Sequence, residues 1–218
     1  MTGEKKGILT VVSGFSGAGK GTLMNGLLEH YDYNLSVSVT TRAPREGEVD
    51  GREYFFLTRD AFESMINNGE LIEWAEFVGN YYGTPKAFVE EKLAEGKDVL
   101  LEIEVQGAMQ VKKLFPDSLL IFVTPPSAEE LYRRLVLRGT ESEEVIRKRL
   151  SRACEEAEWI DDYDLLLIND DLEEAIRLLH EIIHDAKAAV PCKIENNREF
   201  ITRIKGQLEK YRMGGNRL

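Results

Sequence analysis

Residues 8–22 read ILTVVSGFSGAGKGT, and this stretch decides the fold. Its first part, Ile8 to Ser13, is a short and largely β-branched apolar run, which is typical of a strand buried on both faces. Gly14 to Lys20 then fits the pattern G-x-x-x-x-G-K, and a helical pattern continues from Lys20 to about His30. A strand, a glycine-rich turn and a helix in this order predict a phosphate-binding loop in an α/β protein.

The loop has the chemistry that a nucleotide phosphate needs. Glycines let the backbone curve so that its N–H groups point inward, and the start of the helix adds a positive partial charge. Lys20 can bridge the β- and γ-phosphates of ATP. We therefore predict that ATP contacts Gly14, Phe15, Ser16, Gly17, Ala18, Gly19, Lys20, Gly21 and Thr22. Gly21 stands where Ser or Thr normally provides a hydroxyl to Mg²⁺, and the string GAGKGT resembles the loop of adenylate kinases.

Strand-like and helix-like segments alternate beyond the loop, which predicts a parallel sheet covered by helices on both faces. Several short strands between Ser36 and Thr84 interrupt the alternation, the first expected over Ser36 to Thr41, and predict an inserted lobe of mixed α/β structure. The expected divisions are a core at residues 7–35 and 98–190, the lobe at 36–84, a returning helix at 85–97, a small helical lid at 136–150 and an extension at 191–218.

The C-terminal extension is basic on an acidic protein. Residues 192–218 carry seven Lys and Arg against three Glu, and Phe200, Ile201, Ile204 and Leu208 recur at helical spacing. We expect a helix that packs on the body of the protein. An arm that binds a partner or another subunit is the alternative, and both a monomer and a homo-oligomer remain open.

Composition excludes several classes of protein. The chain has 28 Lys and Arg against 39 Asp and Glu, a net charge of −11, which opposes general binding to nucleic acid. It contains no apolar run long enough for a membrane span and no signal-peptide pattern, so we expect a cytoplasmic protein without a membrane partner. His180 and His184 lie four residues apart, but no nearby cysteine or third histidine completes a metal site.

A second informative string begins at Thr40, in the inserted lobe. It reads TTRAPREGEVDGREY and holds Arg42 and Arg45 on either side of a proline; arginine makes bidentate contacts with phosphate. The strings IEWAEF, from Ile72, and NYYGT, from Asn80, add an acid, hydroxyls and aromatic rings. One carboxylate can accept both N1–H and N2–H of guanine, so this lobe could recognise a guanine base.

Together these strings resemble the guanylate kinase family, which transfers phosphate from ATP to GMP. The resemblance covers about residues 7–188 in register, and the combination of TTRxPRxGExxGxxY with IEWA and NYYGT is specific to that family. It implies a core with a parallel sheet, a GMP-binding lobe and a lid. The matching stretches are Val12 to Thr22, Ser36 to Tyr54, Leu71 to Thr84, Leu101 to Gly107, Pro125 to Thr140 and Ile168 to Asp171.

The resemblance also assigns roles to single residues. Ser38, Glu73 and Thr84 fall where the family contacts guanine. The positions that hold the GMP phosphate fall on Arg42, Arg45, Tyr54 and Tyr82, with Glu48 as the acid that follows the second arginine. Lys20, Arg42, the lid residue Arg138 and Arg149 would surround the transferred phosphoryl group, whereas Asn169 and Asp170 fall near the adenine end of the ATP site.

Two departures concern the metal and the acceptor. Gly21 lacks the usual hydroxyl, and Glu104 stands where the family usually has Asp. We expect Mg²⁺ to bind through ATP phosphates and water, with Glu102 and Glu104 holding those waters and Glu104 also near GMP; direct ligation by Thr22 is the alternative. The expected reaction is phosphorylation of GMP and dGMP by ATP. The alternatives are a non-catalytic guanylate-kinase-like binding module and a related kinase for another nucleotide or a ribosyl phosphate.

Overall fold

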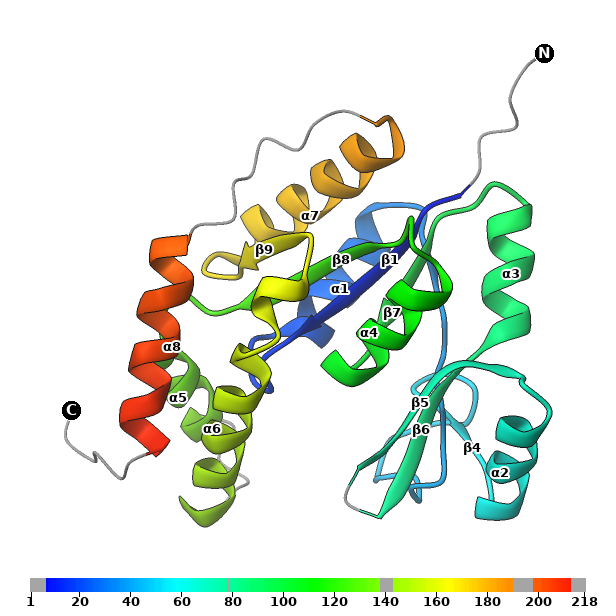
Figure 1. Ribbon diagram of the computed structural model, residues 1–218, viewed down its shortest axis with the longest axis horizontal. Helices are drawn as coiled ribbons and strands as arrows, with labels where there is room; N and C mark the ends of the chain where they lie inside the picture. Colours follow the sequence, from blue (N-terminus) through cyan, green and yellow to red (C-terminus); the bar gives the residue numbers. More distant parts are fainter. Residues whose placement is uncertain (1–6, 78, 138–142, 190–197, 213–218) are drawn as a thin grey trace. The chain divides into compact units, whose positions relative to one another are not determined.

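The computed structural model of the chain describes residues 7–77, 79–137, 143–189 and 198–212 (Figure 1). It divides into two compact units, each described by itself below. The first unit comprises Met1–Val11 and Asp32–Leu119, and the second comprises Val12–Tyr31 and Leu120–Leu218. The boundary runs through strand β1 (Leu9–Gly14), so this strand belongs to both units.

A five-stranded sheet is built around β1, in the order β2-β7-β1-β8-β9. All six residues of β1 are buried, which explains why its sequence is almost continuously apolar. Strands β2 (Asn34–Leu35) and β7 (Val99–Glu102) pair in parallel, as do β8 (Leu119–Thr124) and β9 (Leu165–Ile168). The predicted α/β class with a central parallel sheet is therefore confirmed.

The first unit also holds a second sheet, in the order β4-β3-β6-β5. Its strands are β3 (Val39–Thr40), β4 (Phe55–Phe56), β5 (Leu71–Phe77) and β6 (Asn80–Pro85). Strand β6 is antiparallel to both β3 and β5, whereas β3 and β4 are parallel, so the sheet is mixed. The helices of this unit are α2 (Arg59–Asn67), α3 (Lys86–Ala94) and α4 (Val105–Leu114).

The single strand expected over Ser36 to Thr41 is wrong. The chain instead leaves the first sheet after β2 and joins the second sheet as β3. The Ser36 N–H still donates to the Leu100 carbonyl at 3.0 Å, and the Ser38 carbonyl already accepts from Phe55 in the second sheet at 2.9 Å. The alternating sequence runs across this crossing, with Ser36 buried after β2 and Val39 and Thr40 buried in β3, so the pattern alone hides the change of partner.

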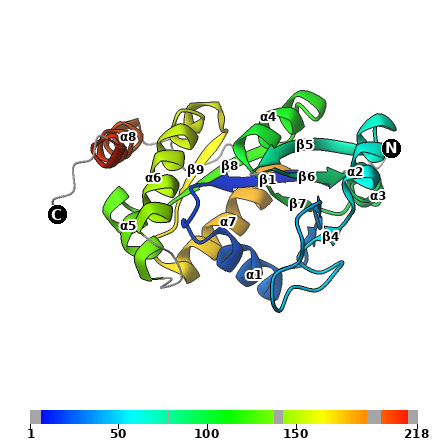
Figure 2. The same cartoon turned by 90° about the horizontal axis from the view of Figure 1, so that it is seen from below.

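The second unit is mainly helical around β8 and β9. Its helices are α1 (Lys20–His30), α5 (Ala128–Leu137), α6 (Glu143–Ala157), α7 (Leu172–Lys187) and α8 (Arg198–Arg212), with a short 3₁₀ turn η1 (Ile160–Asp162). Helices α1 and α7 pack together on one side of β8 (Figure 2). None of the helices in the part of the chain described is long and apolar enough to cross a membrane.

Helix α8 packs against α5 and α6, as the packed-helix interpretation of the extension predicts. Its four periodic apolar residues are all at least 95% buried: Phe200, Ile201, Ile204 and Leu208. Polar contacts add to this packing, because the Gln207 side chain accepts from the Ala128 N–H at 3.2 Å and Lys205 pairs with Asp161 at 2.9 Å. Helix α8 is therefore part of the second unit.

We expect Ile204→Ala to lower the free energy of unfolding by about 3 kcal/mol, because a fully buried isoleucine leaves a cavity. Urea unfolding followed by circular dichroism measures the change. Thr202→Ala, on the exposed face of the same helix, is the control and should change stability by less than about 0.5 kcal/mol. Equal stability of both variants would mean that α8 does not pack in solution.

Candidate functional site

The phosphate loop lies in the second unit, between β1 and α1. Gly14, Gly17 and Gly19 have φ values of 146°, 100° and 88°, a region that side chains disfavour. A Cβ atom on Gly14 would collide with the Val123 backbone, and one on Gly19 would come within 2.7 Å of the Asn169 side-chain nitrogen. These glycines are therefore required by both conformation and space.

Lys20 folds back over its own loop. Its Nζ donates to the carbonyl oxygen of Gly14 at 2.7 Å and to that of Phe15 at 3.2 Å. The first intrahelical bond that closes α1 runs from the Leu23 N–H to the Gly19 carbonyl at 3.0 Å. The preceding N–H groups, at Lys20, Gly21 and Thr22, have no acceptor within the helix and can bind an anion.

Two side chains from outside the loop hold it in place. Asn169 donates to the Ala18 carbonyl at 2.8 Å, and Arg134 of α5 donates to the same oxygen at 3.3 Å. The sequence predicts Asn169 for the adenine end of the ATP site, whereas Arg134 is not among the predicted site residues. The signal for Arg134 was its position one helical turn before Arg138. Glu130 orients Arg134 at 2.7 Å, and hydrogen bonds from Arg133 and Arg134 lower the pKa of Glu130 to about 2.

The other predicted site residues of the second unit that the structure describes lie on α1, on α6 and just before α7. Arg138 lies outside the described residues. Arg149 is half-buried on α6, and Asp170 is exposed before the start of α7. Gly21 and Thr22 are exposed in the first turn of α1, and a Cβ atom on Gly21 would meet nothing within 4 Å.

The first unit positions Glu73 through strand register. Glu73 of β5 lies directly opposite Thr84 of β6, next to an irregularity between Leu71 and Glu73. Directly opposed residues share a face, so the Thr84 hydroxyl donates to the Glu73 carboxyl at 2.7 Å. Both residues are buried, and burial raises the pKa of Glu73 to about 7, with nearby Glu104 also raising it.

Gly107 lies directly beside the Glu73 carboxyl, and it is not among the site residues predicted from the sequence. A Cβ atom at this position of α4 would collide with the Glu73 carboxyl. Gly107 ends the stretch Leu101 to Gly107, which resembles the guanylate kinase family, but the sequence does not show which side chain packs against this glycine. The absence of a side chain at Gly107 lets the carboxyl lie against the start of α4.

The predicted phosphate-binding loop of the first unit is held by Glu48. One carboxylate oxygen pairs with Arg42 at 2.9 Å, and the other accepts the Arg45 backbone N–H at 2.7 Å. The hydrogen bond from Arg42 lowers the pKa of Glu48 below its usual range. The Arg45 side chain is exposed, and its charge also helps to lower the pKa of Glu48. Glu48 thus fixes the conformation of the loop that carries both arginines.

The same loop is attached to β6 through two threonines. The Thr40 hydroxyl donates to the Tyr81 carbonyl at 2.8 Å and accepts the Arg42 N–H at 3.1 Å. The Thr41 hydroxyl accepts the Tyr81 N–H at 2.9 Å. The strings TTR and NYYG, separated by about forty residues in sequence, are therefore brought together by these bonds.

Two predicted tyrosines lie near Arg42. The rings of Tyr54 and Tyr82 meet edge to face with centroids 5.9 Å apart, and the Arg42 guanidinium lies 5.5 Å from the Tyr54 centroid. Burial, and then the neighbouring Tyr82, raise the pKa of Tyr54, so its hydroxyl remains a donor at neutral pH. Of the other predicted residues, Ser38 is half-buried in the segment that links β2 to β3, Glu102 ends β7, and Glu104 is the exposed residue that precedes α4.

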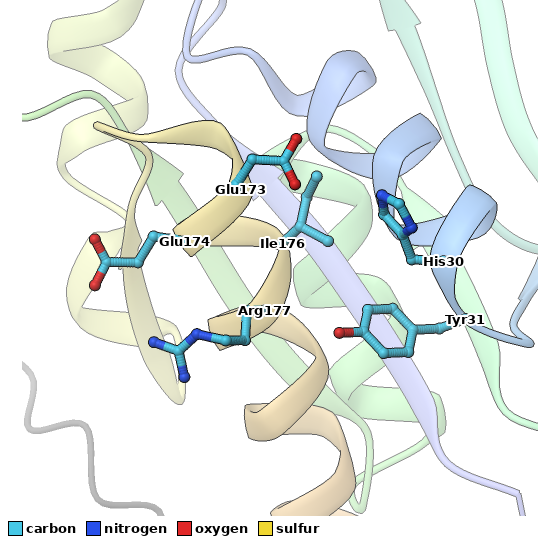
Figure 3. Close-up of a pocket in the computed structure, with 6 residues that line it drawn as sticks. All are labelled: His30, Tyr31, Glu173, Glu174, Ile176 and Arg177. Carbon is cyan, nitrogen blue, oxygen red and sulfur yellow. The ribbon is translucent and has the colours of Figure 1, made fainter.

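A depression elsewhere in the second unit contains none of these residues (Figure 3). It has a volume of about 590 Å³ and is lined by His30, Tyr31, Glu173, Glu174, Ile176 and Arg177. His180 stacks on the Tyr31 ring with centroids 3.7 Å apart, which accounts for one of the paired histidines as a packing residue. No group of three metal-ligating side chains is found in the described parts of the chain.

Comparisons with known proteins agree with this arrangement. The sequence model of the guanylate kinase family matches residues 6–186. The chain is 56% identical to the guanylate kinase of Bacillus cereus over 83% of this chain and 89% of that protein. It is 47% identical to the guanylate kinase of Caldanaerobacter subterraneus over 94% and 98% of the two chains.

A solved structure extends the similarity to the fold. The crystal structure of guanylate kinase from Anaplasma phagocytophilum matches with a TM-score of 0.71 at 34% identity, covering 92% of this chain and 97% of that one. The family match spans most of the sequence, and the relatives are similar along nearly their whole length. With the glycine-rich loop and the buried Glu73–Thr84 pair in place, the chain belongs to the guanylate kinase family.

Proposed function

We propose that this protein transfers the γ-phosphate of ATP to GMP, and also to dGMP, producing ADP and the corresponding diphosphate. The observation that carries the choice of base is the buried Glu73 carboxyl held by the Thr84 hydroxyl. A carboxylate at this place can accept N1–H and N2–H of guanine together, and adenine offers no such pair of donors. Ser38 would add a hydroxyl to the same base.

The GMP phosphate would bind to the loop that carries Arg42 and Arg45. Arg45 is exposed and available, and Arg42 is held by Glu48 with its guanidinium between the loop and Tyr54. Tyr54 and Tyr82 would donate their hydroxyls to the same phosphate. Glu48 would then act by orienting the two arginines, and its contact with GMP would be indirect.

ATP would bind at the phosphate loop of the second unit, from Gly14 to Thr22. The N–H groups at the start of α1 and the Lys20 ammonium would contact the phosphates. Asn169 and Asp170 would lie toward the adenine. In-line transfer requires the two phosphates to meet, with Lys20, Arg42, Arg138 and Arg149 neutralising the charge that spreads over the transferred group. No covalent intermediate on the protein is needed.

Two carboxylates are available for a magnesium ion that arrives with ATP: Glu102 ends β7 and Glu104 directly precedes α4. Mg²⁺ commonly keeps several waters while binding phosphate oxygens. Glu102 and Glu104 would hold those waters, and the exposed Thr22 hydroxyl is the alternative ligand. When bound, the ion would neutralise negative charge on the ATP phosphates.

The phosphate loop argues against a non-catalytic binding module, because such modules characteristically lose it. The buried acid argues against another acceptor nucleotide or a ribosyl phosphate. We propose the cytoplasm as the location, with ATP and GMP as the partners and no nucleic acid or membrane among them. Both a monomer and a homo-oligomer are compatible with the proposal.

The test is ADP release from ATP with GMP, dGMP, AMP or UMP as acceptor, measured by a coupled assay. We expect turnover with GMP and dGMP, and at least a hundredfold lower kcat/KM with AMP and UMP, since a site built for donor pairs rejects bases that lack them. Binding of GMP without any ADP release would support the binding module instead.

We predict that kcat/KM for GMP falls as the pH is lowered through about 7, because the Glu73 pKa lies near this value and protonation removes the acceptor for guanine. Glu73→Gln is the control, since its amide cannot titrate, and it should weaken GMP use by about 2 kcal/mol or more at pH 8. A pH dependence of kcat/KM that comes from the GMP phosphate would persist in this variant. If kcat/KM falls equally near pH 7 in the wild type and in Glu73→Gln, the assignment of Glu73 is contradicted.

The same pKa predicts the effect on stability. Between the ordinary pKa of 4.5 and the folded value of about 7, the folded state binds the proton more tightly than the unfolded state. The neutral carboxyl therefore contributes stability below pH 4.5 that is lost as the pH rises to 7. Glu73→Gln should be more stable than the wild type at pH 8, by up to about 3 kcal/mol.

Phosphate capture and transfer should separate by mutation. Arg45→Ala should mainly raise the KM for GMP, because the exposed guanidinium would contact a phosphate already present in the ground state. Arg138→Ala should lower kcat by about 10²- to 10³-fold, as expected for a lost donor to transition-state charge. Initial-rate kinetics with both substrates varied measures the split. A near-normal kcat with lower thermal stability would instead assign Arg138 to the helix terminus.

Gly21→Ser should raise the apparent affinity for Mg²⁺ without changing the KM for GMP. The position is exposed, and a Cβ atom meets nothing within 4 Å, so the hydroxyl can be added without a clash. Activity measured over a series of free Mg²⁺ concentrations gives the affinity, with Gly21→Ala as the matched control. If Thr22 is already the ligand, Thr22→Ala will lower the affinity and Gly21→Ser will have no effect.

A further inference from the structure

Glu156 of α6 is a buried carboxylate to which the proposed reaction assigns no role. It is only 3% exposed. One of its oxygens accepts the backbone N–H of Ser16 in the phosphate loop at 3.3 Å, and the other accepts from Arg152 at 2.9 Å. A buried carboxylate is costly unless it is paired and hydrogen-bonded, so its presence beside an anion-binding loop requires a reason.

The bond to Ser16 reaches Lys20 through a single peptide group. The N–H of Ser16 and the carbonyl of Phe15 belong to one planar peptide unit, so fixing one fixes the other. The Phe15 carbonyl accepts the Lys20 Nζ at 3.2 Å and the Ala18 N–H at 3.0 Å. Glu156 therefore sets the orientation of the peptide that holds the phosphate-binding lysine and closes the turn.

The same helix face carries the arginine assigned to transfer. Arg149, Arg152 and Glu156 are spaced by three and four residues, so they follow one stripe of α6. Anchoring Glu156 to the loop consequently fixes where this stripe lies relative to the loop. Arg152 compensates the acid, which would otherwise repel the phosphates of ATP.

We propose that Glu156 is a positioning residue: it fixes the Phe15–Ser16 peptide, and through it Lys20 and the face of α6 that carries Arg149, for binding of ATP. The proposal rests on the proposed function for its kinetic consequence, but its binding consequence concerns ATP alone. Because Glu156 contacts only the ATP side of the proposed reaction, we expect GMP binding in the first unit to be independent of it.

The test compares Glu156→Ala with Glu143→Ala. Glu143 lies in the same helix and pairs with Arg147 at the same i,i+4 spacing, but both side chains are more than 60% exposed. Isothermal titration with ATP and Mg²⁺ in the absence of GMP gives the Kd, and initial rates with each substrate varied give the KM values. Thermal melts show that each variant is folded at the assay temperature.

We expect Glu156→Ala to raise the Kd and KM for ATP about tenfold, the effect of losing one hydrogen bond to a charged group, with the KM for GMP changed less than twofold. Glu143→Ala should leave all three constants unchanged. A lower melting temperature with unchanged Kd for ATP in the folded variant would make Glu156 merely structural and overturn the proposal.

If Glu156→Ala does not fold, Glu156→Met decides. Its side chain fills similar buried space but offers Ser16 no oxygen acceptor, so we expect the same rise of about tenfold in the Kd for ATP. A Kd equal to that of the wild type overturns the proposal. Failure of the proposed function is distinguishable, because wild-type protein would then release no ADP with GMP while the ATP titrations would still give their result.

Discussion

The dominant constraint on this molecule is that an acidic chain must bind two polyanions. A net charge of −11 repels nucleotide phosphates at long range, so attraction must be produced locally. In the proposed sites, backbone N–H groups at the start of α1 would provide this attraction, together with arginines that carboxylates hold in place. Arg42 has Glu48, Arg134 has Glu130 and Arg152 has Glu156. Acids here serve to orient cations, and the overall negative charge is compatible with anion binding for that reason.

The phosphate loop shows how completely a short backbone segment can be fixed. The Phe15 N–H donates to Val123, the Ser16 N–H to Glu156 and the Ala18 N–H to Phe15. The Ala18 carbonyl accepts from Asn169 and Arg134. Partners therefore come from β8, α6, α5 and the end of β9, so the loop depends on the packing of the whole second unit. A preformed loop loses little entropy on binding, which favours affinity.

The sequence predicted the elements with strong local signals and missed those that depend on packing. The loop from Gly14 to Thr22 and the helices were predictable because glycine spacing and apolar periodicity are local properties. The division between β2 and β3 was not, because a strand keeps the same alternation when its neighbours change. Arg134, Gly107 and Glu156 were also missed, since each acts on a residue far away in sequence. A glycine that accommodates Glu73 looks like any helical glycine until the two strands bring that carboxyl beside it.

The buried Glu73 carboxyl has a consequence for the stoichiometry of nucleotide binding. With a pKa of about 7, the free protein carries this group about half protonated at neutral pH. In the proposed contact guanine needs the ionised form of Glu73, so GMP would bind with loss of the remaining proton. Acceptor binding in the proposed reaction is then coupled to proton release, and the heat of binding depends on the ionisation enthalpy of the surrounding buffer. The affinity for GMP would therefore depend on the pH of the solution.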